Sequence, residues 1–380
     1  MRYYIISGEA SGDLHGSNLI KELKKIDSNA KFRAWGGNLM QKEGAEIIKH
    51  YKDLAFMGFA EVIKNLSTIK KNMSFCVNDV KNYNPDVLIL VDYPGFNLRI
   101  AKKLYGSGIK IFYYISPTIW AWHKSRIKTI RKYIDKMFVI LPFEKDFYKH
   151  LSYNVDYVGN PVKDAVCEYL ETKKDYTLKN FINDNNLSNN KKIAILPGSR
   201  NQEIEKILPI MLSVVKNYTD FEFIIAAAPN YTEKYFYKNF NIPYNVKILN
   251  NKTYDILNFS DFALVASGTA TLETALFNTP QIVCYKTSNI SYYIAKSLVN
   301  IKYISLVNLI MDNNVITELI QNDFTNKKLS NELNKLIFDK KYLNNIFENY
   351  KILNKKIGEK GTSKRLAKLI TDYLNNNKHN

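Results

Sequence analysis

The sequence predicts an α/β protein built from two doubly wound parallel-sheet domains. Short apolar runs without polar alternation, such as Asp86–Asp92, are typical of strands that are buried on both faces of a parallel sheet. These runs alternate with helix-patterned segments in two successive series, and a polar connection over residues 163–190 separates the series. A chain of 380 residues is also long enough for two domains.

The first predicted domain opens with a strand, a glycine-containing loop and a helix. The apolar stretch Tyr3–Ser7 is the strand, Gly8–Asp13 is the loop, and apolar residues from Leu19 onward recur at helical spacing. Gly8, Gly12 and Gly16 are four residues apart, so the loop differs from the G-x-G-x-x-G dinucleotide fingerprint. Further strands are predicted at residues 32–37, 86–92, 109–115, 137–141 and 155–158, with a basic helix at 124–132.

Several carboxylates follow predicted strands of this domain. Asp92 ends the most apolar strand, and ligands of open α/β sheets bind beyond the carboxyl ends of strands. Asp92 is therefore a catalytic candidate, and the alternative is that it only caps the next helix. Glu9 and Asp13 in the glycine loop could hydrogen-bond a sugar or could simply complement the amino terminus of a helix.

The segment 54–73 carries an apolar face at helical spacing, preceded by apolar loop residues. Most such faces pack into a core, but an interfacial helix on an anionic membrane has the same pattern. The residues that would face a membrane are Phe56, Met57, Phe59, Val62, Ile63, Leu66 and Ile69.

The second predicted domain contains the stretch around which the chain is best understood, Phe262–Phe277. An apolar strand, a small polar turn and a helix follow one another there. A helix that begins on Ser-Gly-Thr offers unpaired N–H groups and a positive dipole end to an anion. The alternative is an ordinary capped helix with nothing bound. The other strands of this domain are predicted at 193–196, 223–227, 246–249 and 281–285.

The loop Pro197–Arg200 supplies a second candidate phosphate contact at the end of a predicted strand, where Arg200 could donate charge-assisted hydrogen bonds to a diphosphate. Together with the loops at 8–13 and 266–271, it describes a cleft between two domains that suits a nucleotide-linked substrate. The chain has no D-x-D pair to hold a metal, so metal-free stabilisation of a leaving phosphate by Arg200, backbone N–H groups and a helix dipole is expected.

Composition narrows the function classes. The formal net charge of +18 favours a polyanionic partner, namely nucleic acid, an anionic membrane or phosphorylated substrates, although abundant Lys and Asn also fit a general compositional drift. The three cysteines are far apart, the amino terminus lacks a signal-peptide layout, and no apolar run is long enough to span a bilayer. A reduced cytosolic compartment is expected. A Walker P-loop and a G-x-S-x-G elbow are both missing.

The order of the motifs resembles that of the lipid-A-disaccharide synthase family. The resemblance rests on Ser7-Gly-Glu-Ala-Ser-Gly-Asp13, Met57-Gly58 with Glu61-Val62, Asp92-Tyr-Pro-Gly-Phe-Asn97, Ser116-Pro-Thr-Ile-Trp-Ala-Trp122, Leu141-Pro-Phe-Glu144, Leu196-Pro-Gly-Ser-Arg200, Ala266-Ser-Gly-Thr-Ala270 with Glu273, and Asn308-Leu309. It implies two Rossmann-like domains facing across a cleft in the GT-B arrangement. The implied reaction joins UDP-2,3-diacylglucosamine to 2,3-diacylglucosamine 1-phosphate with release of UDP and formation of a β-1,6 disaccharide.

Carried over to this sequence, the resemblance assigns roles to named residues. It makes Asp92 the base or orienting group for the acceptor hydroxyl, and it places Glu273 near the ribose and Asn308 near the donor phosphates. The UDP-binding residues would be Gly198, Ser199, Arg200, Ser267, Gly268, Thr269, Ala270 and Thr271, and the first-domain cleft would be lined by Glu9, Ser11, Gly12 and Asp13. Two positions depart from the family pattern: Gly95 stands where an acidic residue is common, and Val307 where Pro is usual.

The resemblance also favours membrane docking for the 54–73 face, since two diacylated substrates must be drawn from a bilayer. It implies a cytoplasmic enzyme on the inner membrane, with an anionic membrane surface as partner, a homodimer, no cofactor and no nucleic acid. The expected domains are 1–165 and 166–345, with 346–380 returning to the first domain or swapping to a partner. The rivals are another GT-B enzyme, such as a UDP-N-acetylglucosamine epimerase or a muramyl-type glycosyltransferase, and a basic nucleic-acid or nucleotide-binding protein.

Overall fold

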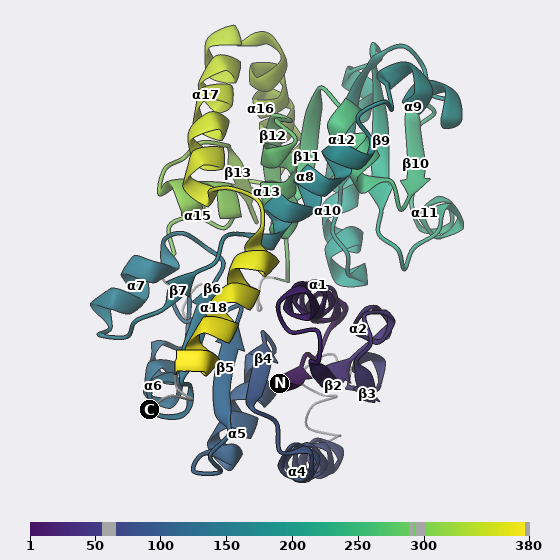
Figure 1. Ribbon diagram of the computed structural model, residues 1–380. Coiled ribbons are helices and arrows are strands. Elements are labelled where there is room, and N and C mark those ends of the chain that lie inside the picture. Colours follow the sequence, from purple (N-terminus) through teal and green to yellow (C-terminus); the bar gives the residue numbers. More distant parts are fainter. Residues whose placement is uncertain (55–65, 289–291, 293–300, 377–380) are drawn as a thin grey trace. The chain divides into compact units, whose positions relative to one another are not determined.

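The computed structural model describes residues 1–54, 66–288, 292 and 301–376 (Figure 1). The chain divides into two compact units, one formed by Met1–Pro161 with Lys360–Asn380 and the other by Val162–Glu359. Each unit contains a parallel sheet flanked by helices. The predicted fold class of two doubly wound parallel-sheet domains is therefore confirmed.

The first unit holds a seven-stranded sheet in the order β3-β2-β1-β4-β5-β6-β7, and every neighbouring pair is parallel. The strand order reverses between β1 and β4. The carboxyl ends of these two strands lead into the Gly8 loop and into Asp92, which is where an open α/β sheet places its ligands. The strands are β1 (Arg2–Ile6), β2 (Lys31–Gly36), β3 (Glu46–His50), β4 (Val87–Val91), β5 (Lys110–Tyr114), β6 (Lys136–Val139) and β7 (Asp156–Tyr157).

Helices cover both faces of this sheet because successive residues of its strands point to opposite sides. Tyr3 and Ile5 of β1 pack into one buried cluster, whereas Tyr4 and Ile6 pack into another. The helices of the unit are α1 (Ala10–Ile26), α2 (Asn38–Lys42), η1 (Tyr51–Leu54), α4 (Leu66–Tyr83), α5 (Pro94–Leu104), η2 (Lys124–Arg126), α6 (Ile127–Tyr133), α7 (Glu144–His150) and α18 (Thr362–Asn376).

The last helix, α18, returns to the first unit and packs against α1 (Figure 1). Leu366, Ile370 and Leu374 enter the same buried cluster as Tyr3 and Ile5. The Nε of Arg365 donates to the carbonyl oxygen of Val158 at 2.9 Å, at the end of the short strand β7. The chain passes back at Glu359–Lys360, whereas residues 346–357 belong to α17 (Lys340–Ile357) of the second unit.

The second unit holds a six-stranded parallel sheet in the order β10-β9-β8-β11-β12-β13. Its strands are β8 (Lys191–Leu196), β9 (Phe221–Ala227), β10 (Val246–Asn250), β11 (Phe262–Ala266), β12 (Gln281–Tyr285) and β13 (Glu318–Ile320). Its helices are α8 (Pro161–Thr172), α9 (Leu178–Asp184), α10 (Asn201–Ser213), η3 (Val215–Asn217), α11 (Glu233–Asn239), α12 (Thr253–Phe259), α13 (Thr269–Leu276), α15 (Leu306–Met311), α16 (Asn326–Phe338) and α17.

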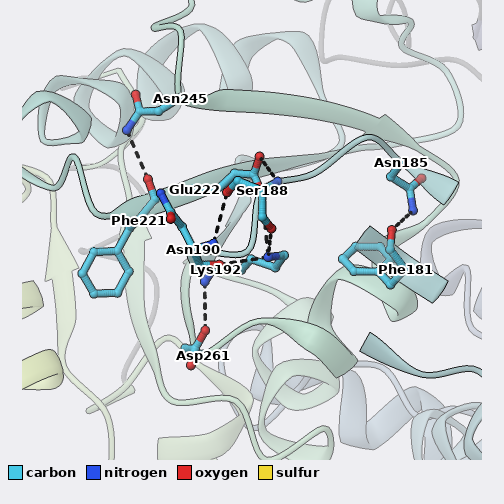
Figure 2. A network of polar contacts seen from close by, with 9 residues as sticks. All are labelled: Phe181, Asn185, Ser188, Asn190, Lys192, Phe221, Glu222, Asn245 and Asp261. Carbon is cyan, nitrogen blue, oxygen red and sulfur yellow. Dashed lines mark hydrogen bonds and ion pairs between the residues drawn. The ribbon is translucent and has the colours of Figure 1, made fainter. Parts of the chain in front are cut away.

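A buried ion pair joins β8 and β9 of this second sheet near their amino ends (Figure 2). Lys192 and Glu222 are both buried, and their charged atoms lie 3.7 Å apart. The Lys192 ammonium also donates to the carbonyl oxygens of Ser188 and Asn190 at 2.9 Å, and the Ser188 N–H reaches both Glu222 oxygens at 3.0 Å. Buried charges require such complete pairing. The pair lies where β8 and β9 begin. The loops 197–200 and 266–271 begin at the opposite end of the sheet, after the carboxyl ends of β8 and β11.

Two strands, β3 and β13, are missing from the sequence prediction. Each is one of the two edge strands of its sheet, so only one neighbour pairs with it. The strand β3 is half-exposed and lacks an apolar run, and β13 has three residues. The prediction of fully buried strands from continuous apolar runs cannot detect edges of this kind.

Candidate active site

Asp92 lies in an unusual backbone turn at the carboxyl end of β4. Asp92 has φ +46° and Tyr93 has φ +51°, so two successive residues other than glycine adopt the left-handed conformation before α5 begins at Pro94. This conformation is uncommon for residues with a Cβ, and it is more frequent for Asp than for Tyr. The N-cap of α5 is Tyr93, so Asp92 precedes the cap and is not the capping residue itself.

Burial raises the pKa of the Asp92 carboxyl to about 6, and the negative charge of Glu9 adds to this effect, while the backbone N–H of Tyr93 opposes it. A carboxyl with this pKa is mostly ionised at neutral pH and is also basic enough to accept a proton from a reacting hydroxyl. This raised pKa therefore suits Asp92 for general-base chemistry.

The Gly8 loop packs directly against the Asp92 turn. A Cβ added to Gly8 would lie 2.5 Å from the Tyr93 ring, so only glycine lets the ring rest on this backbone. A Cβ on Gly12 would similarly meet the Cβ of Ser7 at 2.7 Å. Glu9, the N-cap residue of α1, and Ser11 are exposed. Glu9 and Asp92 therefore belong to adjoining segments, and the negative charge of Glu9 contributes to the raised pKa of Asp92.

Asp13 departs from its expected place in the lining of a cleft. Its side chain is 2% exposed, and its carboxylate accepts hydrogen bonds from the backbone N–H groups of Gly37 at 2.8 Å, Leu39 at 3.0 Å and Met40 at 3.1 Å. These are the groups that the amino terminus of α2 leaves without intrahelical partners. Asp13 therefore caps α2 from a neighbouring helix, and its carboxylate is occupied by structural contacts.

The second unit contains a pocket of about 410 Å³ at the carboxyl ends of β8 and β11. It brings together the two loops that the sequence marks as phosphate-binding candidates, 198–200 and 266–270. The remaining lining comes from the ends of neighbouring strands and from the start of α12. The lining residues are Leu196, Gly198, Ser199, Arg200, Glu203, Ala226, Ala228, Pro229, Thr253, Ala266, Ser267, Gly268, Thr269 and Ala270.

Arg200 is held loosely on the rim of this pocket. Its side chain is 72% exposed, and its guanidinium lies 3.5 Å from the carboxylate of Glu203. The backbone N–H of Ser199 donates to the same carboxylate at 3.3 Å. Gly198 has φ +111°, and a Cβ there would meet Glu203 at 2.7 Å. Glu203 thus holds the loop in place, and its contact with Arg200 is exposed enough to exchange for a ligand phosphate.

In the turn at 267–271, some polar groups make internal hydrogen bonds and others are accessible to a ligand. The hydroxyl of Ser267 donates to the carbonyl oxygen of Ile304 at 2.9 Å, and the hydroxyl of Thr271 donates to that of Gly268 at 2.8 Å. Gly268 and Thr269 are exposed, and the N-cap position of α13 is Gly268, which has no side chain to satisfy the first N–H groups. These N–H groups and the positive end of the helix dipole can bind an anion.

Glu273 lies one turn into α13 and accepts a hydrogen bond from the Tyr254 hydroxyl at 2.9 Å. Burial raises the pKa of its carboxyl. Tyr254 follows Thr253, a pocket-lining residue, so the contact between Tyr254 and Glu273 lies next to the pocket. Sequence reasoning missed both Tyr254 and Glu203, because neither belongs to a recognisable motif.

Asn308 is a structural residue in this arrangement. It is fully buried, and its Nδ2 donates to the carbonyl oxygen of Ile316 and to the Glu318 carboxylate, both at 2.9 Å. Its Oδ1 accepts from the backbone N–H groups of Val315 at 2.9 Å and Ile316 at 3.1 Å. Both donor and both acceptor positions of the amide are therefore used. Direct contact with donor phosphates, as expected for this residue, would require breaking these bonds.

Most of the residues expected to face a membrane, namely Phe56, Met57, Phe59, Val62 and Ile63, lie outside the described residues. Leu66 is the first residue of α4. Ile69 differs from its expected role, because it packs against the buried cluster that contains Met73 and Cys76 of the same helix. Its place one turn from Met73 directs it toward the sheet. Ile69 is therefore a partly buried residue that packs against the core.

Ser116 and Glu144 form a buried contact that sequence reasoning did not assign. The Ser116 hydroxyl donates to Glu144 at 2.5 Å, and the backbone N–H of Leu141 donates to the other carboxylate oxygen at 2.9 Å. Burial raises the pKa of Glu144 to about 7. The contact joins the segments that follow β5 and β6, and β5 lies directly beside β4. Both residues occur in quoted motifs, but only the strand order shows that they meet.

The described part of the chain offers neither a metal-binding cluster nor a membrane-spanning helix. No group of three or more His, Cys, Asp or Glu side chains there is arranged to hold a metal ion. None of the helices described for this chain combines the length and apolar character needed to cross a bilayer.

The sequence matches a family model described as lipid-A-disaccharide synthetase over residues 3–374. Three curated proteins with the name lipid-A-disaccharide synthase are similar over nearly their whole lengths. The protein of Syntrophus aciditrophicus is 36% identical, covering 96% of this chain and 95% of the relative. That of Coxiella burnetii (strain CbuG_Q212) is 34% identical, with 97% and 98% covered. That of Geobacter sulfurreducens is 32% identical, with 98% and 97% covered.

Solved structures share the fold at much lower identity. A UDP-GlcNAc 2-epimerase from Methanocaldococcus jannaschii, solved in complex with UDP-GlcNAc and UDP, aligns with a TM-score of 0.66 at 12% identity, covering 98% of this chain and 99% of that chain. An epimerase from Neisseria meningitidis bound to UDP-GlcNAc aligns with a TM-score of 0.61 at 14% identity and the same coverage. At this identity the likeness shows the fold alone, and it confirms the expected GT-B class.

Proposed function

The chain belongs to the lipid-A-disaccharide synthase family, and from this premise we propose how its residues divide the work of glycosyl transfer. The protein is a hexosyltransferase of lipid A biosynthesis that acts on a UDP-sugar and a phosphosugar. The finer assignment names UDP-2,3-diacylglucosamine as the donor and 2,3-diacylglucosamine 1-phosphate as the acceptor. The products are then UDP and a β-1,6-linked disaccharide 1-phosphate.

The catalytic step is an inverting displacement with Asp92 as the general base. Asp92 takes the proton of the acceptor's primary hydroxyl as its oxygen bonds to the anomeric carbon of the donor. The bond from that carbon to the UDP oxygen breaks on the opposite face, and the bonding electrons leave with UDP. The observation that carries this assignment is the partly buried carboxyl at the carboxyl end of β4, with its pKa raised to about 6.

The second-unit pocket binds UDP in this proposal. Arg200 on its rim and the uncapped N–H groups of α13 stabilise the diphosphate as it leaves, without a metal ion. Glu273, which is fixed by Tyr254, accepts hydrogen bonds from the ribose hydroxyls. Asn308 supports this site indirectly, because the first residue of its own helix, α15, touches the turn at 267–271: the Leu306 N–H donates to the Thr271 hydroxyl at 3.2 Å.

The decisive experiment follows UDP release from UDP-2,3-diacylglucosamine with and without the acylated phosphosugar. Release that requires the acceptor supports transfer, whereas acceptor-independent turnover or use of unacylated UDP-GlcNAc would favour an epimerase.

Asp92→Ala should reduce turnover by about 10²-fold or more, since a general base contributes at least that much. Its UDP affinity should stay unchanged, and Asp175→Ala, which removes an exposed carboxylate, is the control. Near-normal turnover of Asp92→Ala would remove Asp92 from the mechanism.

The donor site is tested separately by calorimetry. Arg200→Ala should weaken UDP binding by about 10- to 100-fold, the range expected for loss of a charge-assisted hydrogen bond. Lys216→Ala removes an exposed positive charge elsewhere in the same unit and should leave the affinity unchanged. Equal UDP affinities of the Arg200→Ala variant and the unmodified protein would refute this role.

Peripheral association with the inner membrane and a homodimer complete the proposal. The support is the pattern of apolar residues in the segment 54–66, the net charge of +18 and the exposed basic side chains of η2 and α6. Flotation with anionic liposomes is the test. Leu66→Glu should reduce co-flotation, whereas Ser67→Glu, which adds the same charge at an exposed neighbour, should not. Failure of the unmodified protein to float would count against docking. Sedimentation over a range of concentrations tests the dimer.

A further inference from the structure

Two buried side chains, one from β5 and one from α5, donate hydrogen bonds to the backbone of Asp92. One is Tyr113 of β5, the strand next to β4 in the sheet. Its hydroxyl donates to the carbonyl oxygen of Asp92 at 2.6 Å, and the residue is fully buried. A buried tyrosine hydroxyl needs a partner, and here that partner is the carbonyl of the first left-handed residue.

The other is Asn97, in the first turn of α5. Its Nδ2 donates to the same Asp92 carbonyl oxygen at 2.7 Å and also lies 3.3 Å from the carbonyl oxygen of Val91 and 3.5 Å from that of Ile6. Asn97 therefore ties the carboxyl ends of β1 and β4 to the turn. Among the described residues, its buried Oδ1 has no hydrogen-bond partner, so all the hydrogen bonds seen for this amide are made by its Nδ2.

These contacts act on a backbone that would otherwise relax. Two consecutive left-handed residues, one of them a tyrosine, persist only when the surroundings over-determine them. The Asp92 N–H is also bound, to the Tyr114 carbonyl oxygen at 2.9 Å, and the Tyr93 ring rests on Gly8. The direction of the Asp92 Cα–Cβ bond follows from this conformation, so a change in the backbone would turn the carboxyl away.

We propose that Tyr113 and Asn97 are positioning residues that hold the Asp92 backbone in its left-handed conformation and thereby aim its carboxylate at the acceptor hydroxyl. This inference rests on the proposed role of Asp92 as the base. Neither side chain touches the substrate in this account, and both act through the Asp92 carbonyl. A purely structural role would lower stability without changing how Asp92 reacts.

The test compares Tyr113→Phe with Tyr153→Phe. Tyr153 is the matched control, because its hydroxyl also donates to a backbone carbonyl of the first unit, that of Ile134 at 3.2 Å, away from Asp92. Tyr113→Phe should lower kcat by about 10- to 100-fold, the loss expected when a reacting group is misplaced. The donor KM and UDP affinity should stay unchanged. Release of the Asp92 carboxyl toward water should also move the acid limb of the kcat/KM profile to lower pH. Tyr153→Phe should change none of these quantities.

A double-mutant cycle with Asp92→Ala decides whether Tyr113 acts through Asp92. In the Asp92→Ala background, Tyr113→Phe should cause no further loss of kcat. Equal losses in both backgrounds, or a normal kcat for Tyr113→Phe alone, would overturn the positioning role while leaving Asp92 as the base. Normal turnover of Asp92→Ala would instead overturn the base and the positioning role together. Asn97→Ala should reproduce the kcat loss, provided that circular dichroism shows a folded protein.

Discussion

At the scale of single residues, Asp92 illustrates how position in a sheet sets the working pKa of a carboxyl. Desolvation disfavours the ionised form, and the nearby charge of Glu9 disfavours it further, so the pKa of Asp92 rises to about 6. The same carboxyl on an exposed helix face would titrate near its ordinary value. Its pKa therefore depends on the turn after β4 and on the adjoining Gly8 loop.

This pKa predicts the acid limb of the pH–rate profile. A general base must be ionised, and Asp92 is protonated below about pH 6, so kcat/KM should fall about tenfold per pH unit below that value. Glu9→Gln removes the repelling charge and should move the acid limb to lower pH. The profile is measured with saturating donor, and Glu43→Gln serves as the control. An acid limb near pH 4 in the unmodified protein would contradict the assignment.

Asn308 carries a second residue-scale prediction, one of stability. Asn308→Ala would leave the backbone N–H of Ile316 without this partner and would remove one of the hydrogen bonds accepted by the Glu318 carboxylate. The cost should be about 3 kcal/mol, which corresponds to a fall in Tm of roughly 6–12 °C for a domain of this size. Asn314→Ala changes an exposed asparagine of the same loop and should leave Tm unchanged. A lower UDP affinity with an unchanged Tm would show that Asn308 contacts the donor directly.

At the scale of elements, α18 shows that a terminal helix can be part of a core built from the other end of the chain. Ile370 is fully buried in the cluster with Tyr3 and Ile5, whereas the adjacent Leu369 is 37% exposed. Ile370→Ala should destabilise the protein by about 2–5 kcal/mol, and Leu369→Ala by much less. Thermal unfolding of the two variants measures the difference. Equal effects would mean that α18 does not pack on α1 in solution.

At the scale of the whole molecule, Glu144 links stability to pH. Burial raises its pKa to about 7, so the folded state keeps a proton that the unfolded state loses near its ordinary pKa. The sign follows: between about pH 4.5 and 7 the unfolded state binds fewer protons, and stability falls as pH rises. Over this window the loss is about 3 kcal/mol.

Glu144→Gln should remove this contribution, because glutamine does not ionise. The urea midpoint of the variant should therefore fall less between pH 5 and pH 7 than that of the unmodified protein. Asp146→Asn, an exposed acid on the same helix, should keep the original pH dependence. Parallel midpoint curves for Glu144→Gln and the unmodified protein would contradict the buried, protonated state.

The sequence by itself determined the two parallel-sheet domains and the loops that follow their strands, and it marked Asp92 and Arg200 as the leading site candidates. These features are local, since an apolar run of five residues and the glycines or prolines after it are read without knowing what packs against them. Strand β11 begins and ends where its apolar run does.

Only the tertiary structure decided which polar groups are free. Asp13 and Asn308 stand in motifs beside residues that remain accessible, but the partners of Asp13 lie at the start of α2 and those of Asn308 lie at and just before the start of β13. The tertiary structure also decided that Ile69 packs against the core, that Ser116 contacts Glu144, and that the Tyr113 hydroxyl donates to the Asp92 carbonyl. Hydrogen bonds between segments 20 or more residues apart depend on strand order and crossovers, which set the distance between two side chains independently of their spacing in the sequence.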